Sequence, residues 1–401
     1  MKVALSWIWP SRLAECSFRF ERYLEGFRAL GHEPVLVCAR SSWSESFEAW
    51  DRHLAADRGG LREPGFWREV GADLVVVVAW HQFLPELAAM RAAGGRIAAF
   101  ADTDGLVGRR VFARETARRE WASHESLEHR LRWFRNRLGG RYWQWRRGEY
   151  PEDAMAVEST RLSDAVLFGH VGGAAAFSRV LEAAGAPELA SRLHVVPFAI
   201  AEPFSAAPLA REREPRVVAI GRWDAVQKNV ELLAEVVRRR FRERPDTRFD
   251  LFGEGREDFL LRLADRVPTL TVHGPKPYPE VARTLARARV LLMTSRWEGC
   301  PHAALEALTC GCTLVGTPMP SLTTWCAEGF GRVAPANAGE LHRALRAELE
   351  AWEAGERDAP AIARTWRERL DPTEIARGIL AAVGLPAGDL SVVGSRTPAT
   401  S

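Results

Sequence analysis

Short apolar runs of strand length alternate with helical segments along almost the whole of this sequence. The run Leu74-Val-Val-Val-Val-Ala-Trp80 is apolar throughout instead of alternating with polar residues. Such runs are typical of parallel strands buried on both faces, and neighbouring parallel strands need helical crossovers between them. The pattern therefore predicts the α/β class, with parallel sheets covered by helices.

The expected elements form two series, separated by residues 201–215, which contain three prolines and no periodicity. Because 401 residues exceed what one hydrophobic core usually serves, we expect two domains. The predicted boundaries are 1–203 for the first domain, 204–215 for a linker, 216–360 for the second domain, 361–385 for closing helices and 386–401 for a disordered tail. Strands are expected at 2–7, 34–38, 73–79, 96–100, 164–168 and 193–197, then at 216–220, 248–252, 270–273, 289–293 and 313–316; helices in the first half are expected at 17–30, 84–92, 109–160 and 174–184.

Charge and cysteine usage exclude several classes of protein. The formal net charge is +3, so the overall charge gives no reason to expect nucleic acid as a partner. No cleavage signal follows the N-terminal strand, and the longest apolar run is far shorter than the ~20 residues that span a bilayer. A cytoplasmic location is expected, with a peripheral position at the inner membrane face as a further hypothesis. The cysteines form no CxxC pair and are predicted to be reduced thiols, without a disulfide or zinc site: residues 16, 38, 300, 310, 312 and 326.

Two glutamates, Glu298 and Glu306, flank a strand–turn–helix junction. The apolar strand ends at Met293, Gly299 and Pro301 make the turn, and the helical pattern begins there. Free backbone N–H groups and the helix dipole at such a junction favour an anionic or oxygen-rich ligand. A carboxylate beside those donors can bind hydroxyl groups, so the segment predicts a site for a phosphorylated sugar. The alternative is a pair of glutamates that face solvent.

A second candidate segment carries two cations, Arg222 and Lys228, between the strand ending at Gly221 and the next helix. Cations on one loop can converge on a diphosphate, the arginine as a fork and the lysine as a point charge. The alternative is a solvated loop with two surface cations. Further on, Gly253-Glu-Gly255 follows a strand, but it lacks the third glycine of a dinucleotide site, so no nicotinamide site is predicted.

In this order, Gly221-Arg222 with Lys228, Gly253-Glu-Gly255, His273-Gly274 and the glutamate pair resemble the nucleotide-sugar half of a retaining glycosyltransferase. The sequence is similar to the bacterial family-4, glycogen-synthase-like group 1 transferases. The resemblance is strong over 215–335 and looser over 1–205. It implies the GT-B fold, in which two Rossmann-like, doubly wound parallel-sheet domains face each other across a cleft.

The resemblance also implies roles for individual residues. Glu306 matches the glutamate that binds the ribose hydroxyls, and Glu298 matches the one near the donor sugar. Arg222 and Lys228 match the cations that hold the diphosphate and stabilise the leaving group. Such cations can replace a metal, so no divalent ion is expected. The predicted catalytic set is Arg222, Lys228 and Glu298; the predicted donor-binding set is Gly221, Gly253, Gly255, His273, Gly299, Cys300, Pro301, His302 and Glu306.

Three places depart from the family pattern. The glycine-rich loop after the first strand is replaced by Trp7-Ile-Trp-Pro-Ser-Arg-Leu-Ala14, and the later glycine pair by Pro318-Met-Pro-Ser321. The histidine usual after the fourth strand is absent. Asp102 there, or His81 after the third strand, is the candidate polar residue on the acceptor side; His81 is alternatively a structural histidine.

The segment 106–150 holds twelve arginines against five glutamates, with four tryptophans and an apolar stripe at Leu127, Leu131, Phe134 and Leu138. One hypothesis is contact with an anionic membrane surface or a lipid-linked acceptor. The other is a helical hairpin whose stripe packs on the first domain while its arginines face water. No nucleic-acid-reading module is recognisable here.

The sequence therefore predicts a glycosyltransferase that moves a sugar from a nucleoside-diphosphate sugar to a glycan, lipid-linked or small-molecule acceptor, with retention of configuration. The alternatives are a degenerate, non-catalytic transferase that acts as a binding partner, and a sugar phosphorylase of the same fold. The presence of both cations and both glutamates favours an active enzyme. A sugar-nucleotide epimerase has less support, because the glutamate pair does not point to it.

Overall fold

The structure is a computed structural model, and its described residues are 1–8, 13–39, 53–57, 59–78, 83–101, 131, 134–135 and 151–386. The predicted tail lies outside them apart from its first residue. So do residues 9–12 of the first loop and all of the segment 106–150 except Leu131, Phe134 and Arg135. Among the described residues no helix is long and apolar enough to cross a membrane.

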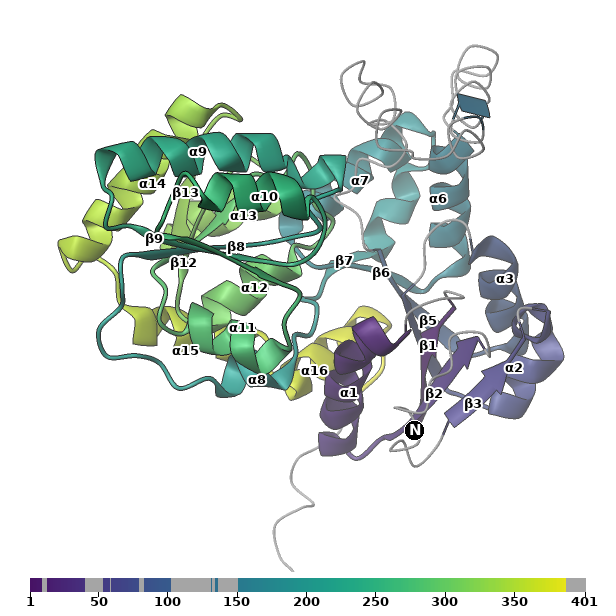
Figure 1. Cartoon of the computed structure of the whole chain (residues 1–401). Coiled ribbons are helices and arrows are strands. Elements are labelled where there is room, and N and C mark those ends of the chain that lie inside the picture. Colours follow the sequence, from purple (N-terminus) through teal and green to yellow (C-terminus); the bar gives the residue numbers. More distant parts are fainter. Residues whose placement is uncertain are drawn as a thin grey trace, which may run out of the picture.

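The first half of the chain forms a seven-stranded parallel sheet in the order β3-β2-β1-β4-β5-β6-β7 (Figure 1). Its central strands are almost wholly buried, as expected for apolar runs covered on both faces. The strands are β1 (Lys2–Trp7), β2 (Glu33–Ala39), β3 (His53–Ala56), β4 (Leu74–Val78), β5 (Arg96–Phe100), β6 (Ala165–Phe168) and β7 (Leu193–Val195).

Helices cover both faces of this sheet. Several of them end at a glycine in the left-handed conformation, such as Gly71 after α2 and Gly94 after α3, which is a frequent helix stop. The helices are α1 (Leu13–Ala29), η3 (Gly60–Arg62), α2 (Pro64–Val70), α3 (Leu84–Ala93), α6 (Pro151–Leu162), α7 (Val171–Ala183) and η6 (Pro187–Arg192).

The second half forms a six-stranded parallel sheet in the order β10-β9-β8-β11-β12-β13. The chain moves outward from β8 in one direction and then from β11 in the other. The two strands at which the direction reverses are neighbours, and ligands of open α/β sheets bind at the carboxyl ends of such a pair. The strands are β8 (Arg216–Ile220), β9 (Arg248–Phe252), β10 (Leu270–Gly274), β11 (Val290–Met293), β12 (Thr313–Gly316) and β13 (Gly331–Val333).

Two groups of helices sandwich the second sheet (Figure 1). On one face lie α9 (Val230–Glu243), α10 (Glu257–Ala264) and α14 (Ala338–Glu353), which pack on side chains of β8 and β9. On the other face lie α11 (Tyr278–Leu285), α12 (His302–Thr309) and α15 (Ala359–Arg369). The remaining helical elements are α8 (Glu202–Ala206), η7 (Val226–Lys228), α13 (Pro320–Trp325), η8 (Cys326–Phe330) and α16 (Pro372–Ala382).

One buried cluster is continuous between the two sheets. It includes Leu5 of the first sheet, Phe204 of α8 and Leu291 of the second sheet. The last helix, α16, crosses back and packs on α1 of the first domain, where the backbone of Pro372 lies against Gly26. The chain therefore crosses between the two halves twice, once through 196–206 and once before α16.

The predicted α/β class and the pair of parallel sheets are confirmed. The predicted strands are all present, most of them within a residue or two of their expected limits. Two edge strands, β3 and β13, were not predicted. The helical region expected over 109–160 agrees with the residues that the structure describes there: α6 occupies Pro151–Leu162, and Leu131, Phe134 and Arg135 are helical. Part of the predicted linker is helical, because α8 extends to Ala206.

Candidate active site

The candidate site begins with two interlocked loops at the carboxyl ends of β8 and β11. The amide of Arg296 donates to the carbonyl of Gln227 over 2.7 Å, and the Gln227 side-chain amide donates to the carbonyl of Trp297 over 2.7 Å. The hydroxyl of Thr294 donates to the carbonyl of Lys228 over 2.9 Å. Backbone groups that no strand or helix uses are thus satisfied between the loops, which fixes one loop relative to the other.

Lys228 and Glu298, one from each loop, form a salt bridge. The Nζ of Lys228 lies 2.6 Å from Oε1 of Glu298, and the Gln227 amide donates to the other carboxylate oxygen over 3.0 Å. Their side chains are 17% and 8% exposed, so the pair is mostly removed from water. The sequence predicted that both residues face the donor, and the structure places them together. The positive charge of the lysine is thus held by the glutamate.

Arg222, the other predicted cation, is exposed and makes no ion pair with a residue that the structure describes. Its guanidinium is therefore available to an anion. The loop that carries it packs tightly on the loop after β9. A Cβ on Gly253, whose φ is +109°, would lie 1.9 Å from the carbonyl oxygen of Gly221, and one on Gly255 would lie 2.7 Å from the amide nitrogen of Asp224. Both glycines, predicted to bind the donor, thus allow two protein loops to touch.

The predicted strand–turn–helix around the glutamate pair is present. Pro301 is the N-cap of α12 and offers no side-chain oxygen to the first helical N–H groups. Glu306 lies one turn inside the helix and is 7% exposed, as is Glu298 in the preceding loop. A helix N-terminus with a buried carboxylate on each side therefore borders the interlocked loops, an arrangement that suits a ligand with both negative charge and hydroxyl groups.

His273, predicted to bind the donor, belongs to the end of β10. Its Nε2 lies 2.6 Å from Oδ1 of the buried Asp250, and its ring stacks on Phe252 with centroids 4.4 Å apart and planes 5° apart. Arg216 donates to the second oxygen of Asp250 over 2.6 Å. The carboxylate thus orients the imidazole, which is only partly exposed.

Two residues of the first domain, both missed in the sequence, contact the turn before α12. The Nε2 of His170 lies 2.9 Å from the carbonyl oxygen of Gly299. Phe198 stacks on His302, with ring centroids 5.7 Å apart and planes 22° apart. The available signal was the sequence Gly169-His-Val-Gly-Gly173 at a strand–helix junction, but the partner of His170 is 129 residues away.

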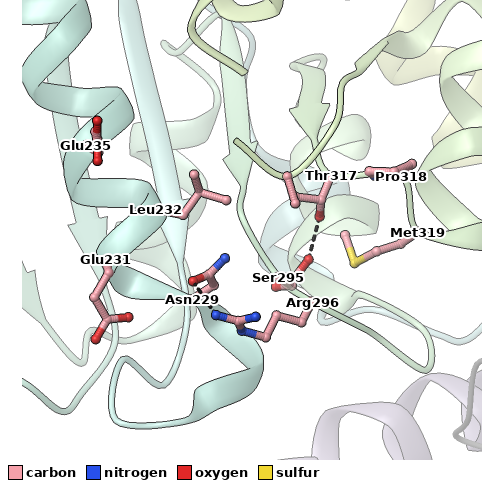
Figure 2. A pocket seen from close by; sticks show the side chains of 10 residues that line it. Asn229, Glu231, Leu232, Glu235, Ser295, Arg296, Thr317, Pro318 and Met319 are labelled. Carbon is pink, nitrogen blue, oxygen red and sulfur yellow. Dashed lines mark hydrogen bonds between the residues drawn. The ribbon is translucent and has the colours of Figure 1, made fainter. Parts of the chain in front are cut away.

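A pocket of about 570 Å³ opens beside these loops, on the side of α9 (Figure 2). The guanidinium of Arg296 lies at its edge and donates to Oδ1 of Asn229 over 3.0 Å. The pocket adjoins the predicted donor site but does not coincide with it, because neither the two cations nor the two glutamates of that site line the pocket. Its lining residues are Asn229, Glu231, Leu232, Glu235, Ser295, Arg296, Thr317, Pro318, Met319 and Ala336.

The departures from the family pattern fall in different places. Pro318 lines the pocket, and Pro320, two residues on, touches the first domain, since a Cβ on Gly172 would lie 2.7 Å from its Cβ. The second departure thus lies at the contact between the domains. His81, Asp102 and residues 9–12 of the first departing loop lie outside the described residues.

The cysteines whose side chains the structure describes are free thiols: residues 38, 300, 310, 312 and 326. Burial raises the pKa of Cys38 and Cys312 to about 11 and that of Cys326 to about 12, so these thiols are protonated at neutral pH. In the part of the chain that the structure describes, no group of three or more histidine, cysteine or acidic side chains could hold a metal ion.

Comparison with known proteins finds a family model that matches part of the chain, and solved structures of the same fold. Residues 214–350 match the family model described as glycosyl transferases group 1. HepE of Anabaena, solved in complex with UDP, superposes with a TM-score of 0.64 at 12% identity, covering 96% of this chain and 100% of its own. The chain has the GT-B fold. A glycosyltransferase from Rickettsia africae gives a TM-score of 0.65 at 10% identity, over 95% of this chain and 97% of its own.

Among curated proteins, one component of the human phosphatidylinositol N-acetylglucosaminyltransferase is 31% identical over 147 residues. The match spans 34% of this chain and 29% of the human protein. The chain therefore matches less than a third of the length of that relative. HepE has also been solved with UDP and glucose and with UDP-glucose.

Proposed function

We propose that this protein is a glycosyltransferase that moves a sugar from a nucleoside-diphosphate sugar to an acceptor. The observation that carries the proposal is the pair of interlocked loops at the β8–β11 switch point, closed by the 2.6 Å salt bridge between Lys228 and Glu298. The family match over 214–350 spans these loops and α12. HepE binds UDP and UDP-glucose, so a uridine nucleotide is the first donor to test.

In the proposed complex, Glu306 accepts hydrogen bonds from the ribose hydroxyls and Arg222 binds the diphosphate. An incoming diphosphate competes with Glu298 for the ammonium of Lys228. Once released, Glu298 can accept from a hydroxyl of the donor sugar, while Lys228 stabilises the charge that grows on the departing diphosphate. Glu298 would therefore become available to the donor sugar only when a diphosphate is bound.

Two finer features belong to the same proposal. The first is retention of the anomeric configuration, supported by the likeness of the glutamate pair to that of retaining family-4 transferases. The second is catalysis without a divalent ion, supported by Arg222 and Lys228, whose fixed charges lie beside the leaving-group site that we assign.

The acceptor that we propose is lipid-linked and reached at a membrane surface. In the segment 106–150, Leu131 and Phe134 are 56% and 47% exposed, and Arg135 is exposed beside them. The packed-hairpin hypothesis predicted that Leu131 and Phe134 are buried, so it is wrong for these two side chains. Exposed apolar residues in an arginine-rich segment favour an anionic lipid surface. The name of the human relative also includes a lipid, phosphatidylinositol.

The test is a binding and turnover assay with the whole chain. Thermal stability is measured with UDP, GDP and ADP, since a ligand that binds only the folded state raises the melting temperature. The matching nucleotide sugars are then incubated with the protein, with and without a chelator. We expect stabilisation by one nucleoside diphosphate. With water taking the sugar in place of the acceptor, that diphosphate should be released slowly and at equal rates in both conditions. If none of the three nucleotides stabilises the protein, the proposal is refuted. Release of the diphosphate from a nucleotide sugar would exclude a sugar phosphorylase, which cleaves a glycoside with inorganic phosphate and uses no nucleotide sugar.

A further inference from the structure

The turn Gly299–His302, at the mouth of α12, is held from the opposite domain. Its first carbonyl bonds to His170, and its last residue stacks on Phe198. Between them, Cys300 fits against Gly169 so closely that a Cβ there would lie 2.5 Å from the cysteine Sγ. The conformation of this turn therefore depends on the first domain, although the turn belongs to the second.

His170 makes two hydrogen bonds that together define its protonation state. Its Nδ1 accepts from the amide of Gly173 over 3.0 Å and thereby caps the N-terminus of α7. A nitrogen that accepts carries no proton, so the neutral ring has its proton on Nε2 and donates it to the carbonyl of Gly299 over 2.9 Å. The ring is 3% exposed and lies edge-on to Trp325, with centroids 6.2 Å apart.

We propose that His170 is a positioning residue for the donor site: its bond to Gly299 sets the orientation of the Gly299–Cys300 peptide. In a trans peptide the C=O and the following N–H point in opposite directions, and no described peptide is cis. Holding the carbonyl of Gly299 toward His170 therefore aims the N–H of Cys300 away from the first domain's helix α7. This proposal rests on the proposed function, because the turn that His170 orients is the one at which we place the donor.

The two hydrogen bonds can be separated by substitution. An asparagine oxygen lies near the place of Nδ1 and caps helices well, but the side chain is too short to reach Gly299. A glutamine amide lies near the place of Nε2 and can donate to Gly299, but it supplies no cap at the Nδ1 position. His170→Asn thus removes the contact between domains and keeps the cap, whereas His170→Gln does the reverse.

The first measurement needs no ligand. Hydrogen exchange of the backbone amides in 296–305 is followed by mass spectrometry for the wild type and both variants. His170→Asn should speed exchange in that segment, and His170→Gln should leave it near the wild-type rate while lowering the melting temperature by a few degrees. Unchanged exchange in His170→Asn would overturn the inference, whatever the ligand does.

The second measurement is the affinity for UDP. If GDP or ADP is the nucleotide that stabilises the wild type, that nucleotide replaces UDP. A neutral hydrogen bond is worth about 0.5–1.5 kcal/mol, so the dissociation constant in His170→Asn should rise roughly 2- to 12-fold. His170→Gln should restore the wild-type value. Equal affinity in His170→Asn and wild type would also contradict the inference. If no nucleotide binds the wild type but exchange responds as expected, only the proposed function fails.

Asp358→Ala is the matched control. Asp358 caps α15 by accepting from the amide of Ala361 over 3.1 Å, and among the described residues no hydrogen bond or salt bridge joins it to the first domain. The variant loses a helix cap as His170→Gln does, and should lower the melting temperature without changing nucleotide affinity. An equal loss of affinity in this control would show that the effect of His170→Asn is one of general stability.

Discussion

At the scale of single residues, the salt bridge between Lys228 and Glu298 is the feature most open to test. Both side chains are largely buried, so removing one charge leaves the other without its partner, which costs about 1–3 kcal/mol of stability. The same change removes a cation from the site proposed for the departing diphosphate. Loss of one such preorganised group typically lowers the rate about 100- to 1,000-fold.

Lys228→Met should therefore lower kcat by about 100-fold or more, with a smaller change in the half-saturation concentration of the donor. Initial rates of nucleotide release at several donor concentrations give both quantities. Lys276→Met is the control, because Lys276 is 36% exposed and pairs only weakly, at 3.7 Å, with Glu280. An unchanged kcat with a raised half-saturation concentration would show that Lys228 binds the ground state and the transition state equally, and would contradict the leaving-group role.

Glu306→Gln should act on binding instead of rate. A ribose contact is equally strong before and during bond breaking, so its loss weakens both states by the same amount. We expect the dissociation constant of the nucleotide to rise about tenfold, equivalent to roughly 1.4 kcal/mol, with kcat within about twofold of wild type. Titration calorimetry measures the dissociation constant. A large fall in kcat at saturating donor would contradict the ribose assignment.

The residues that sequence reasoning found and those that it missed differ in one physical respect. The cations and glutamates were found because each lies at a local junction of strand, turn and helix that the residues themselves specify. His170 and Phe198 act on a turn in the other domain. No local pattern contains that information, because the pairing arises only when the two sheets are brought together. The salt bridge between Lys228 and Glu298 was missed for the same reason.

At the scale of elements, the close fit between the loops after β8 and β9 depends on Gly253. Its φ of +109° is costly for other residues, and an added Cβ would lie 1.9 Å from the carbonyl oxygen of Gly221, so the loops would have to separate. Gly185 provides a matched comparison, because its φ is +72° and a Cβ there would meet nothing within 4 Å.

Gly185→Ala should lower the free energy of unfolding by about 1 kcal/mol, from backbone strain alone. Gly253→Ala should cost at least about 2 kcal/mol more, from the added overlap with backbone, and should also weaken nucleotide binding by moving the loop that carries Arg222. Urea denaturation followed by fluorescence measures the stability difference. Equal losses in the two variants would show that the loops can separate at little cost.

The edge strands show where an element escapes prediction. The strand β3 consists of His53-Leu-Ala-Ala56, four residues without a β-branched side chain, and β13 begins with Gly331 and is only partly buried. Neither has the long apolar run that identified the central strands. Pairing with a neighbouring strand, rather than local propensity, makes them strands.

At the scale of the whole molecule, three histidines that are partly or fully buried link stability to pH. Burial lowers the pKa of His32, His170 and His342 below the ordinary value of 6.5. Above pH 6.5 these histidines are mostly neutral in both the folded and the unfolded chain. As the pH falls below it, the unfolded chain takes up protons first, so the free energy of unfolding falls until the folded pKa values are reached.

The expected result is a loss of stability between about pH 6.5 and 5, and a shallower loss in His170→Asn. The neighbours of His170 add little charge: α13 brings no ionisable side chain, and the loop before α12 brings Glu298, which is paired with Lys228. Carboxylates with lowered pKa, such as Asp164, respond only at lower pH. Denaturation midpoints at half-unit pH steps test this, and identical slopes for the two proteins would contradict it.

The last prediction concerns where the whole molecule acts. The segment 106–150 carries a net charge of +7, from twelve arginines less five glutamates, whereas the whole chain carries +3. Each basic residue near an anionic leaflet contributes about 1 kcal/mol, and this contribution weakens as salt screens it. Co-sedimentation with anionic vesicles should therefore occur at low salt and fall at high salt, with little pelleting on neutral vesicles.

A double substitution separates the apolar contribution from the charge. Leu131→Glu with Phe134→Glu should reduce pelleting about tenfold or more without unfolding the protein, because both side chains are exposed and insertion of each is worth about 1 kcal/mol or more. Leu261→Glu is the control: this residue of α10 is 53% exposed and lies in the second domain. Equal, negligible pelleting of all three proteins in every condition would refute the membrane hypothesis and would leave a soluble acceptor as the substrate to seek.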